Sequence, residues 1–407
     1  MDERVKRGLQ IAAFVGSVLL IGTGLYFAFF RGQAGPSRPP AAVPAAPAAP
    51  GSLPSAGLGA PAPAPRPTTA APRLRASAIA NGGATSTNEV AATPAKAIVA
   101  AGSGISYYDP ADGKFYGVDA DGNVRALSEQ AFPQASDVEW NKGADKAVIE
   151  FPDGSNVVYD FATQTQVTLP AHWEDFHFSP GSDEILAKSM GLDPNNRFLV
   201  VSNGDGSNVK SIQALGNNAH KVTVAPSPND QVVAFADTAD PLPGGIGRKL
   251  IVPIGKNQEH FKGLAVEGFG FSPNWAPDGA RLLYSVSGDF SSYLPQLWIV
   301  DATAATMGEH RQALPINTWA DKCAFSGNNS LLCAVPRALP ANAGLQRGLA
   351  DAVADDLFRV DLATGAASRV AVPATNTRMT GLTVTADGSA VFFKNEFTGT
   401  LESIRLK

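Results

Sequence analysis

Cysteine, histidine and aromatic residues are scarce in this 407-residue chain, which has two cysteines, five histidines and 8% aromatic residues. Two cysteines are too few to form a disulfide scaffold, and they are too isolated for a structural zinc site. The net charge of −5 provides no basic surface of the kind that nucleic acids require. We therefore expect neither a zinc-stabilised domain nor a DNA or RNA partner.

Motifs for catalysis and cofactor binding are also lacking. The chain has no G-x-S-x-G nucleophile elbow and no space for the hydrolase domain that would carry one. Its one histidine cluster is HWEDFH, from His172 to His177, whose alternation along a strand supplies no set of three metal ligands. The runs DADGN at Asp119 and NGDGSN at Asn203 lack the final glutamate of a calcium loop and are typical of hairpin turns. We expect no metal and no cofactor.

The N-terminus contains a long apolar segment. Residues 8–30 (GLQIAAFVGSVLLIGTGLYFAFF) carry no charge over 23 positions. A helix rises about 1.5 Å per residue, so this segment is long enough to cross a hydrocarbon core of ~30 Å. Three basic residues precede it, which favours an uncleaved single-pass anchor with a cytoplasmic tail at residues 1–7. A cleaved signal peptide is the alternative, although no clean A-x-A site follows Phe30.

The next segment, residues 31–98, has the composition of a linker. It is rich in alanine and proline, has no aromatic residue and contains one acidic residue, Glu89. Such a composition buries too little apolar surface to offset the entropy lost on ordering. We expect a disordered linker that either holds a C-terminal domain away from the membrane or acts as a spacer of no fixed length.

From about residue 104 the sequence repeats two patterns. The first is a short apolar strand, a turn rich in Gly, Asn, Asp or Pro, and a second apolar strand. Its six copies begin at Val138, Phe176, Val222, Phe271, Cys323 and Leu382. The second pattern is a strand, often ending in Asp, then a turn and another strand. Its six copies begin at Lys114, Asn156, Phe198, Lys249, Gln296 and Asp356. Together the patterns form four antiparallel strands in ~40–55 residues, which is the unit of a β-propeller blade.

Two of the turns carry a recognisable tag. The runs FSPGSDEIL and WAPDGARLLYS resemble the S-P-D-G tag of TolB-type, WD-like propeller repeats, over residues of about 104–407. This resemblance implies an all-β propeller and says nothing about activity, because propellers include enzymes and binding proteins. We expect a β-propeller domain at residues 99–407.

The number of blades follows from the strands at the two ends of the repeat region. Three strand-like pieces precede the first full unit and one piece, TLESIRLK, follows the last inner hairpin. Three strands at each end cannot share one four-stranded blade, which favours seven blades with residues 97–101 (AIVAA) completing the terminal one. Six blades is the alternative.

The two cysteines flank one of the repeated turns. Cys323 and Cys333 lie symmetrically about Asn328, so a regular hairpin places them opposite each other. In an oxidising compartment we expect them to form a disulfide. Two buried thiols are the alternative.

The connections between the second and third strands are long in the middle blades. They are residues 189–196, 237–248, 287–296 and 336–355. In a propeller these connections emerge on one face, and loops on a rigid scaffold commonly carry binding residues. The candidate binding residues in them belong to types that are enriched at interfaces: Arg248, Phe290, Tyr293, Arg337 and Arg347.

These observations favour a membrane-tethered, extracytoplasmic propeller that binds a protein, peptide or glycan without catalysis. The alternative is a propeller enzyme that acts on wall polymer or peptide at the central channel. Such an enzyme needs carboxylates or histidines on the first strand of several blades. Those strands instead contain apolar residues at the repeated positions Val138, Phe178, Val224, Phe271, Phe325 and Val384.

Overall fold

The computed structural model describes residues 15–17, 19–23, 76–119, 122–244 and 247–407. The chain divides into two compact units, Met1–Thr69 and Ala70–Lys407. In the first unit, residues 15–17 and 19–23 are helical. Among the described residues, no helix has both the length and the apolar content that a membrane span requires. Most of the predicted tail, span and linker lies outside the described residues, so the membrane anchor stays a prediction.

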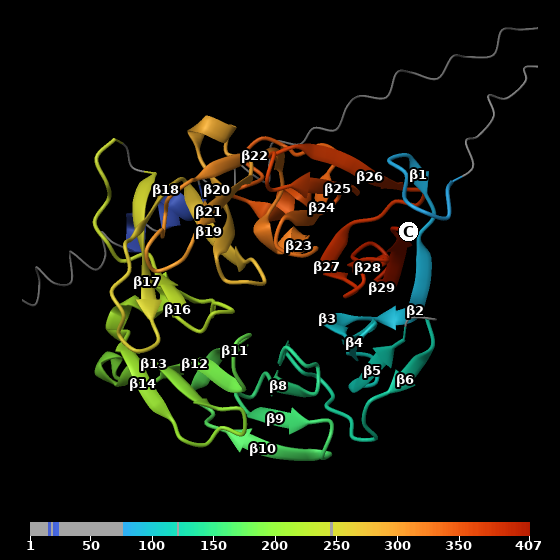
Figure 1. Ribbon diagram of the computed structural model, residues 1–407. Helices are drawn as coiled ribbons and strands as arrows, with labels where there is room; N and C mark the ends of the chain where they lie inside the picture. Colours follow the sequence, from blue (N-terminus) through green and yellow to red (C-terminus); the bar gives the residue numbers. More distant parts are fainter. Residues whose placement is uncertain (1–14, 18, 24–75, 120–121, 245–246) are drawn as a thin grey trace, which may run out of the picture. The chain divides into compact units, whose positions relative to one another are not determined.

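The second unit is a propeller of seven blades (Figure 1). The strands of blades 1 to 3 are β3 (Lys96–Ala101), β4 (Gly104–Asp109), β5 (Lys114–Val118), β6 (Val124–Ala126); β7 (Asp137–Trp140), β8 (Lys146–Glu150), β9 (Asn156–Asp160), β10 (Thr165–Leu169); and β11 (Trp173–Phe178), β12 (Glu184–Met190), β13 (Arg197–Asn203), β14 (Lys210–Ala214). Those of blades 4 and 5 are β15 (Val222–Val224), β16 (Val232–Ala236), β17 (Arg248–Gly255), β18 (Leu264–Glu267); and β19 (Phe269–Trp275), β20 (Arg281–Ser287), β21 (Gln296–Asp301), β22 (Gln312–Asn317).

Blades 6 and 7 are formed by the C-terminal strands together with two strands from the start of the unit. Blade 6 contains β23 (Cys323–Phe325), β24 (Ser330–Pro336), β25 (Asp355–Asp361), β26 (Ala367–Pro373) and β1 (Ala84–Thr85); blade 7 contains β27 (Met379–Val384), β28 (Ala390–Asn395), β29 (Thr400–Arg405) and β2 (Asn88–Pro94). Five short 3₁₀ helices lie in the connections: η1 (Pro194–Asn196), η2 (Gly216–Lys221), η3 (Asp289–Ser291), η4 (Ala320–Lys322) and η5 (Arg347–Ala350). The predicted all-β propeller with seven blades is confirmed.

The strand patterns of the sequence correspond to the two hairpins of each blade. The six copies of the first pattern are the inner hairpins of blades 2 to 7, in which the first strand lies nearest the axis (Figure 1). The six copies of the second pattern are the outer hairpins of blades 1 to 6. Each blade packs between two neighbours, so both of its faces are buried, and this explains the strands that are apolar on both sides.

The closure of the ring differs from the prediction. Strand β2 pairs with β29 and completes blade 7, whereas residues 97–101 belong to β3, the innermost strand of blade 1. The structure also places β1, β2 and part of β3 within residues 31–98, the segment predicted as linker. An outermost strand needs backbone hydrogen bonds more than large apolar side chains. A composition without aromatic residues therefore does not distinguish such a strand from a linker.

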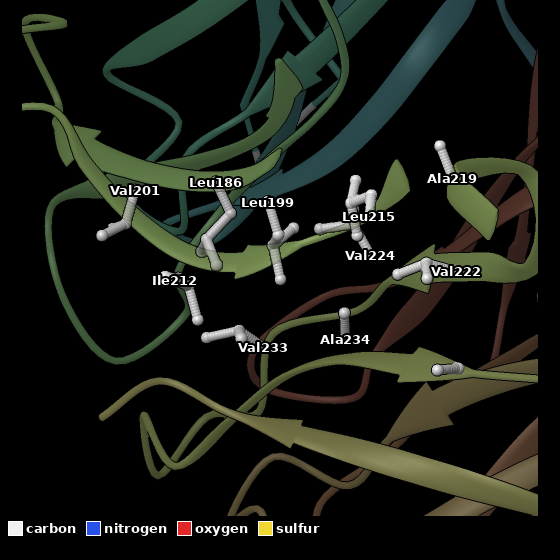
Figure 2. Packing of buried hydrophobic residues seen from close by; sticks show 11 residues of the cluster. Leu186, Leu199, Val201, Ile212, Leu215, Ala219, Val222, Val224, Val233 and Ala234 are labelled. Atoms are coloured by element: carbon white, nitrogen blue, oxygen red, sulfur yellow. The ribbon is translucent and has the colours of Figure 1, made fainter. Parts of the chain in front are cut away.

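The hydrophobic core consists of seven clusters, one between each pair of neighbouring blades. Figure 2 shows the cluster between blades 3 and 4, where Leu186 and Leu199 of blade 3 face Val222 and Val233 of blade 4. Since every blade contributes to two clusters, opening the ring between any two blades would expose apolar surface to water.

The repeated turns are held by their own side chains. Ser227 Oγ accepts hydrogen bonds from the backbone N–H groups of Gln231 and Val232 at 3.1 and 2.9 Å. In the corresponding turn of blade 7, Thr385 Oγ1 accepts hydrogen bonds from Ser389 and Ala390, both at 3.1 Å. A serine or threonine at the start of the turn thus satisfies backbone groups that the hairpin leaves unpaired.

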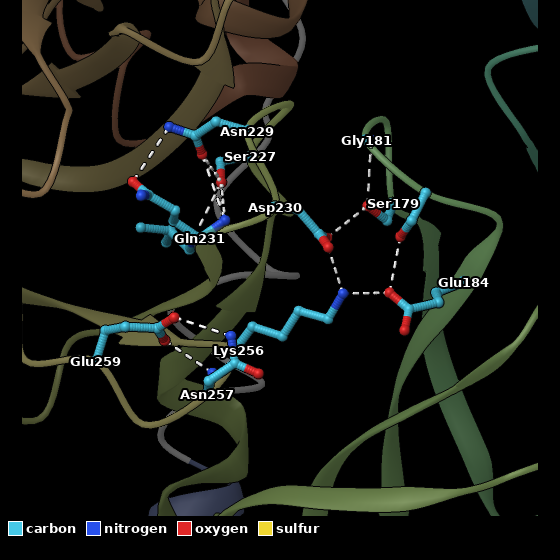
Figure 3. A network of polar contacts seen from close by, with 12 residues as sticks. Ser179, Gly181, Glu184, Ser227, Asn229, Asp230, Gln231, Lys256, Asn257 and Glu259 are labelled. Atoms are coloured by element: carbon cyan, nitrogen blue, oxygen red, sulfur yellow. Dashed lines mark hydrogen bonds and ion pairs between the residues drawn. The ribbon is translucent and has the colours of Figure 1, made fainter.

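One of these turns also joins neighbouring blades. Asp230, in the turn of blade 4, accepts a hydrogen bond from Ser179 Oγ of blade 3 at 3.0 Å. Lys256 of blade 4 pairs with both Asp230 and Glu184, and Glu184 belongs to β12 of blade 3 (Figure 3). The polar turn residues therefore stabilise the seam between these blades.

The two cysteines form the disulfide that their spacing predicts. Cys323 of β23 and Cys333 of β24 are register partners in the inner hairpin of blade 6, and a disulfide joins them. Both side chains are buried in the cluster between blades 5 and 6. The bridge therefore links two strands that are already neighbours.

Candidate functional site

The long connections emerge on one face of the propeller. In each of blades 3 to 6 the second strand runs antiparallel to the third, so the connection between them lies at the same end of every blade. We call this face the loop rim; it consists of residues 191–196, 237–244, 247, 288–295, 337–354 and 396–399, between the second and third strands of blades 3 to 7. The predicted placement of the four long loops on a common face agrees with this topology.

Neighbouring rim loops contact each other. The backbone N–H of Gly344, in the blade 6 loop, donates a hydrogen bond to the carbonyl of Tyr293, in the blade 5 loop, at 2.9 Å. A Cβ atom at Gly344 would lie 2.0 Å from Ser287 Oγ, so only glycine allows this close approach. The two loops therefore form one continuous surface.

Exposed apolar side chains gather on the loop rim. Among the described residues 76–407, ten large apolar side chains are exposed, and six of them lie on this face. These six are Leu192, Phe269, Phe290, Leu345, Leu349 and Phe397. The other four are Ile79, Val124, Val167 and Val209. Phe269 belongs to the rim because it is paired with Ser287, the last residue of β20. Apolar surface concentrated on one face is typical of an interaction site.

A pocket of about 720 Å³ lies on the rim between blades 4 and 5. Its side chains are those of Arg248, Glu267, Phe269, Asp289, Phe290 and Tyr293. Three of the five residues predicted from the sequence, Arg248, Phe290 and Tyr293, therefore line one pocket. Charged groups at its edge and aromatic rings in its wall give it both polar and apolar binding surface.

Intramolecular contacts fix the walls of the rim pocket. The Phe290 ring packs edge-on against Trp298, with the ring centroids 6.2 Å apart. Arg248 Nη1 donates a hydrogen bond to the carbonyl of Pro243 at 3.0 Å. Arg248 Nε lies 3.8 Å from Glu267 Oε1, and both side chains are partly exposed. A weak, exposed ion pair of this kind is easily rearranged by a ligand.

The backbone at Tyr293 is in an uncommon conformation. Ser292 and Tyr293 have φ values of +53° and +57°, in the left-handed region that bulky residues rarely adopt. Hydrogen bonds from the Tyr293 N–H to the Gly288 carbonyl at 2.7 Å and from Ser291 Oγ to the Leu294 carbonyl at 2.6 Å hold the loop in this shape. Strain held in this way is common at binding sites.

The other two predicted residues do not reach the rim pocket. Arg337 Nε donates a hydrogen bond to Asp356 Oδ1 at 2.7 Å. Arg347 Nη2 pairs with Asp321 Oδ2 at 2.6 Å, and its guanidinium carbon lies 4.8 Å from the Trp319 ring centroid. These contacts show Arg337 and Arg347 fixing the blade 6 loop to the propeller.

The sequence analysis missed the aliphatic part of the rim. Leu345 and Leu349 lie in the predicted blade 6 loop, but the choice of candidates by residue type favoured arginine and aromatic residues. Leu192 and Phe397 lie in the corresponding loops of blades 3 and 7. An apolar residue within a polar, glycine-rich loop is a signal that the sequence does contain.

The sequence analysis also missed a polar cluster on the inner strands. His177 Nδ1 of blade 3 lies 3.2 Å from Glu139 Oε1 of blade 2, and His177 Nε2 lies 3.6 Å from Asp175 Oδ1. Burial lowers the pKa of His177, but its contacts with Asp175 and Glu139 outweigh this effect and raise the pKa to about 10. His177 is therefore protonated at neutral pH and cannot accept a proton as a general base.

In the described part of the chain, no group of three or more His, Cys, Asp or Glu side chains is arranged to hold a metal ion. The described residues of the acidic runs at Asp119 and Asn203 make hydrogen bonds of the kind found in hairpin turns. For example, Asn123 Nδ2 donates a hydrogen bond to Asp119 Oδ2 at 2.9 Å, and the Ser207 N–H donates one to Asp205 Oδ1 at 2.9 Å.

Comparison with known proteins shows the fold alone. No protein-family model and no curated protein matches the sequence. Among solved structures, the β-propeller domain of Cps50 (Swd1) from Myceliophteria thermophila is similar with a TM-score of 0.53 at 11% identity, covering 79% of this chain and 100% of that one. The tricorn protease is similar with a TM-score of 0.50 at 12% identity, covering 79% of this chain and 34% of that one.

The comparisons support the β-propeller fold that the TolB-type resemblance implied, and they do not assign the chain to that family. TolB from Acinetobacter baumannii aligns with a TM-score of only 0.39 at 15% identity. The alignment covers 56% of this chain and 55% of that one. The chain spans about a third of the tricorn protease chain. Because one similar structure is named as a protease and another as a propeller domain, the likeness does not decide between catalysis and binding.

Proposed function

We propose that the protein is a membrane-tethered, extracytoplasmic binding module whose loop rim binds a protein or peptide partner without catalysis. The observation that carries this proposal is the concentration of six of the ten exposed large apolar side chains on the rim. Interfaces are rich in aromatic residues and arginine around a desolvated centre. The rim supplies Phe269, Phe290 and Tyr293 around one pocket, with Arg248 at its edge.

The aliphatic residues of the rim favour a polypeptide over a glycan. Leu192 is exposed in the blade 3 loop, and Leu345 and Leu349 are exposed in the blade 6 loop. Aliphatic side chains contribute to binding by burying apolar surface, and a polypeptide provides more such surface than the hydroxyl-covered face of a sugar. A glycan partner, which Phe290 and Tyr293 could stack against, is the alternative occupant.

The disulfide supports an extracytoplasmic location. Disulfides persist in oxidising compartments and are rare where thiols are kept reduced. The bridge between Cys323 and Cys333 therefore fits a propeller placed outside the cytoplasm by an anchor at residues 8–30.

We expect protease added to intact cells to release the propeller as a folded fragment that begins near residue 76. The reason is that a linker at residues 31–75 would be exposed on the outer side while the propeller resists cleavage. Immunoblotting of cells and medium, before and after digestion, measures this release. A mature chain that begins after residue 30 and is already soluble, or a propeller cleaved only after lysis, would contradict the proposed topology.

Photocrosslinking from single positions tests the rim as the binding surface. With a photoreactive residue at Phe290 or Leu345 we expect a crosslink to a second polypeptide in intact cells. Val124 and Val167, exposed on the outermost strands of blades 1 and 2, are the matched control positions. Crosslinks of equal yield from the control positions, or a rim that crosslinks only to glycan, would contradict a protein-binding rim.

One observation favours the alternative of an enzyme at the channel, and another opposes it. The inner strands do bring Glu139, Asp175 and His177 together, as such an enzyme requires. The two carboxylates, however, raise the pKa of the histidine to about 10, so His177 cannot serve as the general base at neutral pH. Binding at the rim is therefore the function that we propose.

A further inference from the structure

A second cavity lies on the inner strands at the end of the propeller opposite the loop rim. Its volume is about 570 Å³, and it is formed by the ends of β7, β11, β15 and β19 with the turns that follow three of them. Blades 2 to 5 therefore contribute to one site, which we call the channel cavity. Cavities of a few hundred cubic ångströms with a mixed polar and apolar lining are typical of ligand sites.

The polar wall of the channel cavity carries two carboxylates and one protonated histidine. Glu139, Asp175 and His177 all line it, and the carboxylates are partly exposed. The buried Lys188 forms an ion pair with Asp175, with Nζ 2.7 Å from Oδ2. Glu139 has no lysine or arginine partner among the ion pairs of the described residues and contacts only the shared His177. Its carboxylate therefore remains able to accept hydrogen bonds from a ligand.

The surroundings add further negative charge. Blades 2 and 3 carry five carboxylates and two cations on and beside their inner strands: Asp137, Glu139, Glu150, Glu174 and Asp175, with His177 and Lys188. Of these, Glu139, Asp175 and His177 line the cavity itself. Burial, together with the smaller effect of the charges of Asp137 and Asp175, raises the pKa of Glu150 to about 7. The excess of carboxylates in blades 2 and 3 therefore favours a cationic group over an anionic one in this cavity.

The opposite wall is apolar and fixed in position. It contains Phe271 and Trp275 of β19, together with Pro226, Pro228 and Pro277. Trp275 Nε1 donates a hydrogen bond to the carbonyl of Ala225 at 2.9 Å, and the indole stacks on Phe235 with the centroids 5.7 Å apart. Phe271 and Trp275 are both partly exposed, so the uncovered parts of their side chains can contact an aliphatic stem or a planar cation.

We propose that the channel cavity binds the cationic head and aliphatic stem of an arginine or lysine side chain, presented by a peptide ligand. Glu139 accepts hydrogen bonds from the cationic head, while Phe271 and Trp275 pack against the stem. A guanidinium suits a carboxylate beside flat apolar walls because it is planar and weakly hydrated. This site lies away from the loop rim and does not depend on the function proposed for it.

Calorimetric titration of the full-length chain in mild detergent with two small probes tests this inference. The probes are Nα-acetyl-arginine amide and Nα-acetyl-citrulline amide, which have nearly the same shape and differ in charge. We expect the arginine probe to bind at least about tenfold more tightly than the citrulline probe, because a charge-assisted hydrogen bond is lost in the latter. Equal affinities, or no binding of the arginine probe, would overturn the inference.

Three substitutions locate the binding. Glu139→Gln keeps the shape of the side chain and should weaken binding of the arginine probe by about tenfold or more. Glu129→Gln, at a fully exposed side chain whose nearest cation is Lys114 at 3.9 Å, is the matched control and should change nothing. Phe290→Ala, on the rim, should also leave the probe's affinity unchanged. An arginine affinity unaffected by Glu139→Gln would place the probe elsewhere and overturn the assignment.

Discussion

Replacing Asp355 by alanine is expected to lower the free energy of unfolding by about 3–5 kcal/mol, because it leaves a buried lysine without its counter-charge. Lys322 Nζ contacts Asp355 Oδ1 and Oδ2 at 2.7 and 2.6 Å, and the side chains are 5% and 0% exposed. The Met379 N–H also donates a hydrogen bond to Asp355 Oδ2 at 2.7 Å, which connects blade 6 to blade 7. Urea unfolding followed by tryptophan fluorescence measures the loss.

Two controls separate the buried charge from general damage to blade 6. Asp321→Ala removes a carboxylate that is half exposed and pairs with Arg347, so we expect a loss of at most about 1 kcal/mol. Replacing both partners, as Lys322→Met with Asp355→Leu, should recover much of the stability, because no unpaired charge remains. An Asp355→Ala protein as stable as Asp321→Ala would contradict this account of the pair.

A chain that begins at residue 99 is expected to be less stable than one that begins at residue 70 by about 4 kcal/mol or more. The shorter chain lacks β2, which has four register pairs with β29, and each lost ladder hydrogen bond costs roughly 1 kcal/mol. It also lacks β1 and the fully buried Ala95. Thermal unfolding followed by circular dichroism compares the two chains.

The matched control for this truncation is a chain that begins at residue 76, the first residue of the described propeller. It should be as stable as the chain from residue 70, because β1 and β2 remain complete. Equal melting temperatures for the chains that begin at residues 76 and 99 would mean that β2 does not close the ring.

The inner and outer hairpins were predictable because their signals are local. Alternating apolar strands joined by Asp-Gly, Asn-Gly or Pro-containing turns specify a hairpin within about 15 residues. The same locality made the disulfide predictable, since Cys323 and Cys333 belong to one hairpin. The long loops of blades 3 to 6 could be placed on one face for the same reason, once the blades were recognised.

Closure of the ring was not predictable, because it depends on contacts between distant parts of the chain. Strand β2 pairs with β29 over more than 300 positions, and its composition matches that of the linker. The contact between Glu139 and His177 joins residues 38 positions apart, on the inner strands of two blades, so no local pattern predicts it. Arg337 and Arg347 were chosen by residue type, and only the structure shows that Asp356 and Asp321 engage them.

The dissociation constant of the partner identified by photocrosslinking tests the proposed rim most directly. A double variant of the full-length chain, Phe290→Ala with Leu345→Ser, should bind that partner at least about tenfold more weakly, because it removes two of the exposed side chains that we propose as binding anchors; tenfold corresponds to about 1.4 kcal/mol. The matched double variant, Val124→Ser with Val167→Ser, changes two exposed residues on the outermost strands and should bind like the unmodified protein. A rim variant with unchanged affinity, or a control variant that loses as much, would contradict binding at the loop rim.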